Sequence, residues 1–372
     1  MTALDAVHVT TVHQWNDPRI LAKECRSLAE AGYAVALITT EPTEESRFGV
    51  PLIGLKRRRN RWTRMTLGVV EAGVKALRSR AGIVHFHDPE LIPIGVIARA
   101  LGRKVVFDVH EDYATSIRTV SKSIPGALRG ILSTAYRASI PLQKALFQIV
   151  IAESYYGETY PRATSVLNHP DLRLFERFRG VERRAPATPR LLYTGNITAA
   201  RGAREHAALI GALPSGSQMR MVGRCDPTLL PELTGRAGLS LDNGGAFAPF
   251  ERIVAAYDAP WTAGLALFPP SPHYTRKALT KVYEYAAAGI PTICSDFPAW
   301  RALVEGNGIG IAVPPDDIAA QVAAVERLST DPKLYARLSR AALDFAHDRT
   351  SWRGQAAHLV GLYGRLSGRA AA

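Results

Sequence analysis

Residues 280–305 have the sequence TKVYEYAAAGIPTICSDFPAWRALVE, which predicts a helix followed by a buried strand. The helix would begin with Thr280 as its N-cap and end before Gly289, and Pro291 prevents it from continuing. The apolar run at 292–295 predicts the strand. The start of such a helix offers free backbone N–H groups to an anion, and phosphate is the most common ligand of this kind.

Apolar runs that predict buried strands alternate with helical patterns over most of the chain. Strands are expected at 7–11, 34–40, 83–87, 105–110, 148–152, 191–194, 219–222, 264–268 and 292–295. Helices are expected at 19–31, 91–101, 202–213, 251–259, 280–288 and 317–328. This alternation predicts an α/β protein with parallel sheets that carry helices on both faces.

The alternation is interrupted at 168–190, a polar and proline-bearing stretch that is typical of a linker. We therefore expect an N-terminal doubly wound domain over 1–180, a C-terminal one over 181–351, and a helical segment over 352–372. Doubly wound sheets bind ligands at the carboxyl ends of their strands. Two facing domains of this kind would place a site in the cleft between them.

Composition limits the class of protein. Hydrophobic residues make up 47% of the 372 residues and charged residues 21%, which is ordinary globular usage and excludes a disordered or fibrous chain. No apolar window is long enough to span a membrane, and no signal-like start precedes the first strand. Three widely spaced cysteines predict reduced, buried side chains. We expect a cytoplasmic protein, peripheral to a membrane at most.

The stretch from Thr280 onward resembles the donor-site helix of the retaining glycosyltransferases of family 4, the glycosyl transferases of group 1. Further segments carry the same resemblance: DPRILAKECRSLAEAGY at 17–33, HFHDPELIP at 85–93, DVHEDY at 108–113 and LLYTGNITAARG at 191–202. The resemblance implies GT-B architecture, with two facing Rossmann-like domains and a cleft between them. It also implies transfer of a sugar from a nucleoside diphosphate sugar, with UDP or GDP, to a hydroxyl acceptor, without a metal or other cofactor.

Glu284 lies early in the predicted helix, where a carboxylate also interacts favourably with the helix dipole. The resemblance gives it a second role, because it matches the second glutamate of a Glu-x7-Glu pair and would bind the ribose hydroxyls. The first glutamate of that pair falls on Arg276, so the contact to the donor sugar departs from the family pattern.

Gly195 ends a predicted strand and would let the backbone approach a ligand, although a simple turn also explains it. Family members carry one basic residue beside this glycine and another about six positions further on, where this chain has Asn196 and Arg201. The expected donor-binding residues are Gly195, Asn196, Arg201, Leu279, Thr280, Lys281 and Glu284, and Arg201 and Glu284 are also expected to be catalytic.

His87 follows a predicted buried strand, a position where a single histidine is more often structural. The resemblance makes it a catalytic histidine that contacts the donor sugar and the acceptor. The expected acceptor-side residues are Asp17, Arg19, His87, Asp88, His110 and Glu111, with Asp112 beside them and His13 as a weaker candidate. The loop that carries His13 and Asp17 lacks the Gly-Gly pair of many family members, so its side chains would meet the ligand.

The net charge of +13 indicates an anionic partner. Residues 56–64, KRRRNRWTR, hold six basic residues, no acidic one and Trp62, and 113–152 hold five basic residues and no acidic one. These segments favour an anionic membrane surface or an anionic acceptor, and a solvated basic face remains the alternative. Nucleic acid is not expected, because no stacking aromatic residues are interleaved with the basic ones.

The sequence is also compatible with three other functions. A nucleotide-sugar epimerase would use the same two-domain fold without an acceptor. A non-catalytic protein that binds a membrane or a partner would explain the departures at Arg276 and Asn196. A hydrolase would use paired carboxylates among Asp88, Glu111 and Asp112, although no single helix or strand face pairs them.

Overall fold

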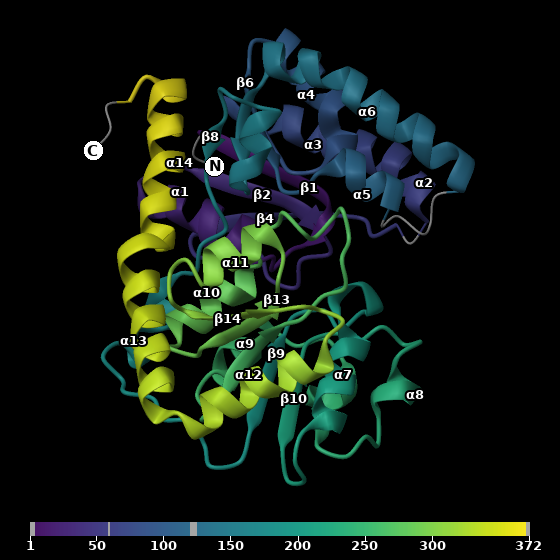
Figure 1. Cartoon of the computed structure of the whole chain (residues 1–372). Helices are drawn as coiled ribbons and strands as arrows, with labels where there is room; N and C mark the ends of the chain where they lie inside the picture. Colours follow the sequence, from purple (N-terminus) through teal and green to yellow (C-terminus); the bar gives the residue numbers. More distant parts are fainter. Residues whose placement is uncertain (1–3, 59, 120–124, 370–372) are drawn as a thin grey trace. The chain divides into compact units, whose positions relative to one another are not determined.

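The computed structural model describes residues 4–58, 60–119 and 125–369 (Figure 1). The chain divides into two compact units: unit 1 comprises residues 1–168 and 352–372, and unit 2 comprises residues 169–351. The sequence suggested a linker near residue 180. In the structure, Phe175 and Phe178 are buried in the core of unit 2, so this segment is part of that unit.

Unit 1 is built on a sheet with the strand order β3-β4-β2-β1-β5-β6-β7-β8. The strands are β1 (Ala6–Gln14), β2 (Val35–Thr40), β3 (Ser46–Arg47), β4 (Val50–Leu55), β5 (Ile83–Phe86), β6 (Lys104–Val109), β7 (Gln148–Ile151) and β8 (Thr164–Ser165). The described pairs are parallel except β3 with β4. The central strands β1, β2, β5 and β6 are largely buried because helices cover both of their faces.

The helices of unit 1 pack on the two faces of this sheet (Figure 1). They are η1 (Ile20–Cys25), α1 (Arg26–Glu30), α2 (Arg61–Thr63), η2 (Arg64–Gly68), α3 (Val69–Arg78), η3 (Pro89–Leu91), α4 (Ile92–Ala100), α5 (Tyr113–Thr119), α6 (Gly126–Leu146), η4 (Ser154–Glu158) and α14 (Trp352–Ser367). The C-terminal helix α14 belongs to this unit, and its Trp352, Leu359, Leu362 and Tyr363 are buried against η1 and α1. The chain therefore returns to its first unit after completing the second.

Unit 2 has a parallel sheet with the order β11-β10-β9-β12-β13-β14. Its strands are β9 (Arg190–Thr194), β10 (Gln218–Val222), β11 (Leu239–Leu241), β12 (Ala263–Ala266), β13 (Thr292–Ser295) and β14 (Gly310–Val313). Its helices are η5 (Leu172–Leu174), η6 (Glu176–Phe178), η7 (Ala199–Arg201), α7 (Ala203–Ala212), α8 (Leu230–Leu233), η8 (Asp242–Gly245), α9 (Phe250–Ala256), α10 (Thr280–Ala287), α11 (Pro298–Val304), α12 (Ile318–Thr330) and α13 (Pro332–Arg349).

Helix α10 is the helix that the sequence predicted over 280–288. Thr280 is not its N-cap, because Leu279 occupies that extended position and no side chain caps the helix. Gly289 follows the helix with a φ of 67°, as its expected C-terminal role requires. On β12, a Cβ at Gly264 would lie 2.4 Å from the ring of Tyr285, so glycine lets α10 pack closely on the sheet.

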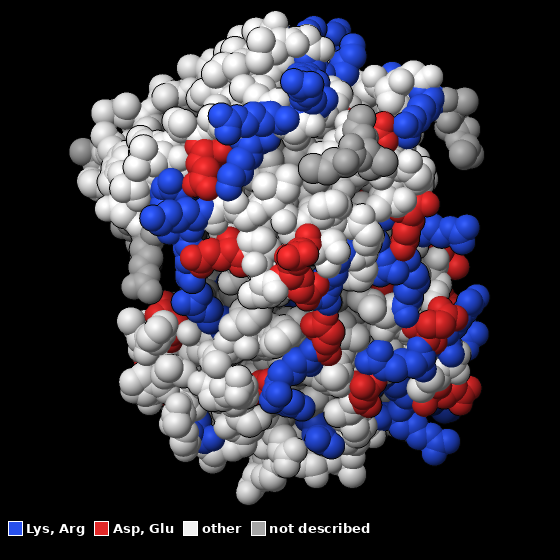
Figure 2. Space-filling model, turned by 180° about the vertical axis from the view of Figure 1, so that it is seen from behind, with Lys and Arg blue, Asp and Glu red and all other residues white. Residues whose placement is uncertain are grey.

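The sequence also led to expectations about the cysteines, membrane-spanning segments and the basic surface. All three cysteines are free and buried, as predicted. Within the described residues, no helix has the length and apolar character needed to cross a bilayer. On the face drawn in Figure 2, basic side chains lie among acidic ones and form no continuous basic surface.

The basic segment 56–64 is partly neutralised by its own unit. Arg58 pairs with Glu71 at 2.7 Å and Arg64 with Glu90 at 3.0 Å. Residue 59 of this segment and residues 120–124 of the second basic segment lie outside the described residues.

Candidate active site

Three of the predicted donor-binding residues lie together at the carboxyl edge of the unit 2 sheet. Gly195 follows β9 with a φ of 104°, a conformation that favours glycine. A Cβ at this position would lie 3.7 Å from Nζ of Lys281 and 3.9 Å from Nη1 of Arg201. Gly195, which is partly exposed, is thus flanked by two basic side chains.

The loop that carries Arg201 is pressed against β12. Gly202 has a φ of 78°, and a Cβ on it would lie 1.7 Å from the carbonyl oxygen of Leu267. Nδ1 of His206 donates to the carbonyl of Gly202, so its Nε2 can accept from the N–H of Leu267 at 3.4 Å. Burial and the charge of Lys281 lower the pKa of His206 to about 3, and the ring therefore stays neutral in this double role.

Lys281 has a buried amine without a hydrogen bond among the described residues. Its side chain is 7% exposed, and Nζ has no hydrogen-bond partner in the described part of the chain. The nitrogen lies 3.5 Å from the ring centroid of Tyr193 and 5.2 Å from that of Phe268. Burial and the charge of Arg201 hold the pKa of Lys281 well below its ordinary value. An unpaired buried donor is costly, so an anionic oxygen bound here would be strongly favoured.

Glu284 lies one helical turn after Lys281 and therefore on the same face of α10. The residue is 7% exposed, and its Oε2 accepts a hydrogen bond from the hydroxyl of Tyr257 at 2.7 Å. This contact holds the carboxylate in place near Lys281.

The other predicted donor-side residues are more open. Asn196 is exposed directly after Gly195, and its carbonyl accepts from the hydroxyl of Tyr193. Leu279 is the N-cap of α10 and Thr280 is its first residue, and both are partly exposed. Arg276, in the place of the family glutamate, is exposed.

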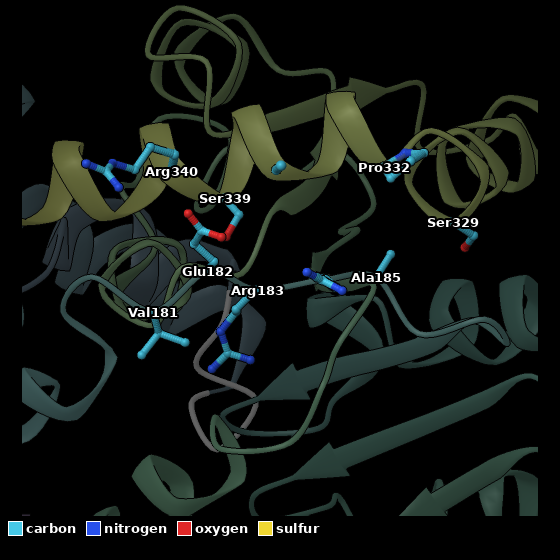
Figure 3. A pocket seen from close by; sticks show the side chains of 10 residues that line it. Val181, Glu182, Arg183, Ala185, Ser329, Pro332, Ser339 and Arg340 are labelled. Carbon is cyan, nitrogen blue, oxygen red and sulfur yellow. The ribbon is translucent and has the colours of Figure 1, made fainter.

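A cavity of about 560 Å³ in unit 2 involves none of the predicted residues (Figure 3). Arg183, which lines it, donates hydrogen bonds to the carbonyls of Tyr257, Ala259 and Ala288. The guanidinium thereby holds the segment that precedes β9 against the ends of α9 and α10. None of the residues that line this cavity belongs to the group around Gly195.

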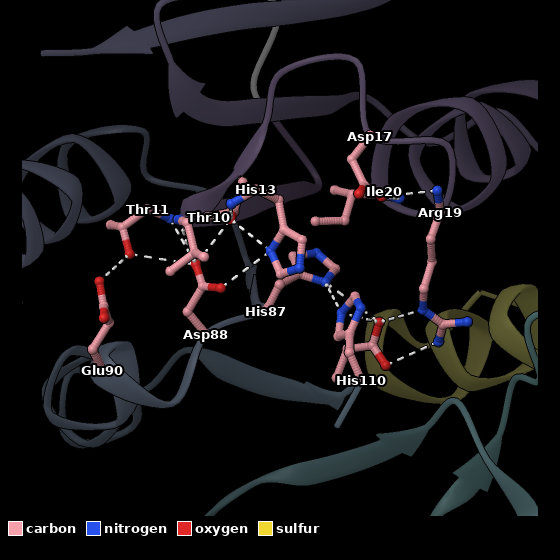
Figure 4. A network of polar contacts seen from close by, with 12 residues as sticks. Thr10, Thr11, His13, Asp17, Arg19, Ile20, His87, Asp88, Glu90 and His110 are labelled. Carbon is pink, nitrogen blue, oxygen red and sulfur yellow. Dashed lines mark hydrogen bonds and ion pairs between the residues drawn. The ribbon is translucent and has the colours of Figure 1, made fainter. Parts of the chain in front are cut away.

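In unit 1, Asp88 joins the ends of β1 and β5 (Figure 4). Its Oδ2 accepts from the hydroxyl of Thr10 at 2.8 Å and from the N–H of Thr11 at 2.7 Å. Its Oδ1 lies 3.1 Å from Nδ1 of His13. Burial alone would raise the pKa of Asp88, but His13 and the N–H of Thr11 hold it well below its ordinary value.

Arg19 is turned towards buried carboxylates (Figure 4). Its guanidinium bonds Asp108 at 2.9 and 3.1 Å, lies 3.0 Å from Oε1 of Glu24 and donates to the carbonyl of Val166 at 2.9 Å. Asp17 accepts from the backbone N–H of Arg19 at 2.9 Å, which begins the helical segment η1. Arg19 therefore holds the interior of unit 1 together, and only 5% of it is exposed.

His87 belongs to a buried chain of hydrogen bonds. Its Nε2 lies 2.9 Å from Nδ1 of His8, and Nε2 of His8 lies 3.0 Å from the hydroxyl of Tyr363 on α14. The same hydroxyl lies 2.9 Å from Nδ1 of His85. All four side chains are inaccessible to solvent. Nδ1 of His87 faces His110 at 2.9 Å and Asp108 at 3.3 Å, so both of its ring nitrogens are engaged.

The hydroxyl of Tyr363 has one proton, so it donates a hydrogen bond to one of His8 and His85 and accepts one from the other. The two rings therefore carry their protons on the same atom, either both on Nδ1 or both on Nε2. Burial alone would raise the pKa of Asp108, but Arg19 and His110 hold it well below its ordinary value, so this carboxylate only accepts and Nδ1 of His87, 3.3 Å away, carries a proton. Burial lowers the pKa of His8 and His85 well below the ordinary value, and that of His87 to about 4. The consistent assignment is three neutral rings with the proton on Nδ1.

The predicted acceptor-side residues thus fall into two groups. Arg19, His87 and Asp88 are buried, whereas Asp17, His110 and Glu111 are partly exposed at the ends of β1 and β6. His8, His85 and Tyr363 were missed by the sequence analysis. The spacing of His85 and His87 on one strand face was a usable signal, because His8 pairs with His85 in register.

Two groups of side chains in unit 1 are close enough to hold a metal ion. They are His8 with Glu24, His85 and His87, and His87 with Asp108 and His110. In both groups, ring nitrogens already hydrogen-bond other side chains, and Arg19 lies beside Glu24 and Asp108. In the first group, Nε2 of His85 and both carboxylate oxygens of Glu24 have no hydrogen-bond partner among the described residues.

Solved structures with the same fold are known. Sucrose-phosphate synthase from Thermosynechococcus elongatus has a TM-score of 0.75 at 18% identity, covering 99% of this chain and 100% of that chain. Anabaena Alr3699/HepE in complex with UDP-glucose has a TM-score of 0.69 at 12% identity, covering 97% and 99%. Trehalose-6-phosphate synthase, studied for glycosyl transfer with retention, has a TM-score of 0.68 at 11% identity, covering 97% and 99%. These likenesses define the class: a protein of the GT-B glycosyltransferase fold.

Family models give the narrower assignment. Residues 19–166 match the model described as glycosyl transferase 4-like domain, and residues 280–345 match glycosyl transferases group 1. The chain belongs to the group 1 glycosyltransferases, as its sequence motifs predicted, and it is a glycosyltransferase. No curated protein matches the chain.

Proposed function

We propose that this glycosyltransferase moves a sugar from a nucleoside diphosphate sugar to a hydroxyl acceptor with retention of the anomeric configuration. The observation that carries the proposal is the unpaired buried Nζ of Lys281, which lies with Arg201 beside Gly195. Two cations at the start of a helix fit the diphosphate of such a donor. The complex of Anabaena Alr3699/HepE with UDP-glucose supports a uridine nucleotide as the first candidate.

In the proposed reaction, the bond between the anomeric carbon and the diphosphate oxygen breaks, and its electron pair stays on the diphosphate. The acceptor oxygen forms the new bond on the same face of the sugar, and the acceptor proton passes to the departing diphosphate. Lys281 and Arg201 stabilise the charge that develops on the diphosphate, so we propose that no metal or other cofactor is needed. Glu284 would hold the ribose hydroxyls.

Unit 1 would bind the acceptor, and it also offers a surface for a membrane. Trp62, Leu67, Val70 and Val74 lie along α2, η2 and α3 with 41–59% exposure. A cavity of about 420 Å³ lined by basic residues, among them Lys56 and Arg57, adjoins the start of this surface. We propose cytoplasmic location with peripheral binding to anionic lipid through this surface.

The membrane proposal is tested by sedimentation with liposomes of phosphatidylcholine alone or with phosphatidylglycerol. We expect binding only to the anionic vesicles, weakened by salt and by Trp62→Ala together with Leu67→Ala. Equal sedimentation with both kinds of vesicle, or none with either, would contradict the proposal.

The reaction itself is tested in two stages. A thermal-shift panel of UDP, GDP, ADP and dTDP should show stabilisation by one base, with UDP first. The matching sugar nucleotide is then incubated with monosaccharide acceptors, and the product anomer is assigned by NMR in the presence of EDTA. Retention without added metal is expected. Loss of transfer in EDTA, inversion at the anomeric carbon, or epimerisation of the donor alone would each refute the corresponding part of the proposal.

A further inference from the structure

The sequence predicted that His87 contacts the substrate in unit 1, but the surroundings of His87 in the structure do not favour this contact. His87 is inaccessible to solvent, and both of its ring nitrogens are engaged, with His8 on one side and with His110 and Asp108 on the other. Any contact between its ring nitrogens and a sugar would first have to break the buried chain. A different histidine at this edge of the sheet is open.

His13, directly after the buried part of β1, has one engaged ring nitrogen and one free. Nδ1 lies 3.1 Å from Oδ1 of Asp88 and 3.2 Å from Oγ1 of Thr10. Because the hydroxyl proton of Thr10 is directed to Asp88, Nδ1 of His13 has to carry its own proton. The side chain is 27% exposed, and Nε2 has no partner among the described residues and is not enclosed.

The orientation of the ring is fixed from two sides. Asp88 is held by the end of β1 as well as by His13, so the carboxylate cannot turn away without losing several hydrogen bonds. The ring of His13 also stacks on that of His110, with 5.2 Å between centroids. A side chain held in this way presents Nε2 in a defined direction, as a binding contact requires.

The charges around His13 indicate the class of ligand. The carboxylates of Asp88, Asp17 and Glu111 act on it, from the loops after β5, β1 and β6. Asp108 and His87 lie behind His110, and Asp108 is paired with Arg19. Carboxylates from three loops around His13 suit the hydroxyl groups of a sugar or another polyol.

We propose that His13 is the histidine of unit 1 that contacts the acceptor, donating its Nε2–H to an oxygen of a neutral, hydroxyl-bearing acceptor. This inference rests on the proposed function and deepens it by naming a contact residue and an acceptor class. Burial alone would lower the pKa of His13, but the hydrogen bond and charge of Asp88 raise it to about 9. The ring is therefore an imidazolium at neutral pH and keeps both of its protons.

Two substitutions separate this role from a structural one. In His13→Asn, the amide replaces Nδ1 and keeps the bond to Asp88, but nothing remains at the position of Nε2. In His13→Gln, the amide reaches the position of Nε2 instead. A contact role predicts that kcat/KM for the acceptor falls about 10- to 100-fold in His13→Asn and recovers at least in part in His13→Gln. A role limited to holding Asp88 predicts the opposite order.

The experiment measures UDP affinity by calorimetry and transfer from UDP-glucose to glucose, mannose and galactose, with their 6-phosphates for comparison. His358→Asn, on the exposed face of α14, is the matched control. We expect the UDP affinity of both His13 variants to stay within twofold of wild type, and a neutral sugar to be preferred over its phosphate. Loss of transfer in His13→Gln but not in His13→Asn, or a preference for the phosphates, would overturn the inference. A wild-type chain that binds no nucleotide would instead refute the proposed function on which the inference rests.

Discussion

At the scale of single residues, Gly202 shows how backbone conformation fixes a site. A side chain at this position would meet the carbonyl oxygen of Leu267, and the positive φ is itself unfavourable for any residue with a Cβ. Arg201 precedes Gly202, so the position of the cation depends on this close approach to β12. In the sequence, the only sign of this close approach is that a glycine follows the arginine.

We predict that Gly202→Ala lowers the free energy of unfolding by at least about 2 kcal/mol, because the loop has to move away from β12. Gly211→Ala is the control, since a Cβ there has nothing within 4 Å and α7 would gain helix propensity. Urea denaturation of both variants checks this. Equal stability of the two variants would show that the loop yields without cost.

Glu284 gives a second prediction at this scale. If its carboxylate accepts hydrogen bonds from the ribose hydroxyls, Glu284→Gln should weaken UDP binding about 10-fold. The effect should disappear with 2′,3′-dideoxy-UDP, which lacks both hydroxyls. An equal loss with both nucleotides, measured by calorimetry, would mean that Glu284 acts through Tyr257 rather than through the ribose.

At the scale of elements, helix α14 contributes Tyr363 to a chain of histidines on β1 and β5. The hydroxyl bridges His8 and His85, and His8 in turn bonds His87. A helix at the end of the chain thereby determines where protons lie in the first sheet. The packing of α14 on unit 1 therefore does more than bury an apolar face, because it also fixes the tautomers of these histidines.

From this hydrogen-bond chain we predict that His8, His85 and His87 carry the proton on Nδ1 in the wild type. Two-bond ¹H–¹⁵N spectra of histidine rings report this directly. Tyr363→Phe should remove the constraint and change the tautomer population of His8 and His85. Tyr33→Phe, which alters a neighbouring ring 5.5 Å away, should leave the spectra unchanged. Mixed tautomers in the wild type would contradict the assignment.

The same scale shows what could be predicted from the sequence. Buried parallel strands such as β2, β9 and β13 were found because their apolar runs are uninterrupted. Strand β4 was missed because Pro51 and Gly54 interrupt its pattern, and α6 because Pro141 lies inside it. Gly195, Arg201 and Lys281 could be grouped, since each lies at a strand end or helix start. The bridge from Tyr363 to His8 could not, because 355 positions separate the two residues.

At the scale of the whole molecule, burial of neutral histidines ties stability to pH. The pKa of His87 is lowered to about 4 and that of His206 to about 3, and those of His8 and His85 are also lowered. Between these values and the ordinary pKa near 6.5, the unfolded chain binds protons that the native chain does not. Stability therefore falls as pH decreases through this window. His13 acts in the opposite sense, because its raised pKa stabilises the fold below about 6.5 and that contribution is lost towards pH 9.

We predict that the free energy of unfolding is greatest near neutral pH and falls steeply below pH 6. Each buried histidine adds a slope of up to about 1.4 kcal/mol per pH unit. Urea denaturation at several pH values between 4.5 and 7 measures this slope, and His206→Gln should reduce it by one such increment. A stability that is constant between pH 4.5 and 6 would contradict the assignment of neutral buried rings.

The central claim is that the unpaired buried amine of Lys281 binds the diphosphate of the donor. Calorimetric titration of UDP into wild type, Lys281→Met and the exposed control Lys333→Met tests it most directly. We expect Lys281→Met to weaken binding at least 10-fold and Lys333→Met to match wild type. Equal affinity of wild type and Lys281→Met would contradict it.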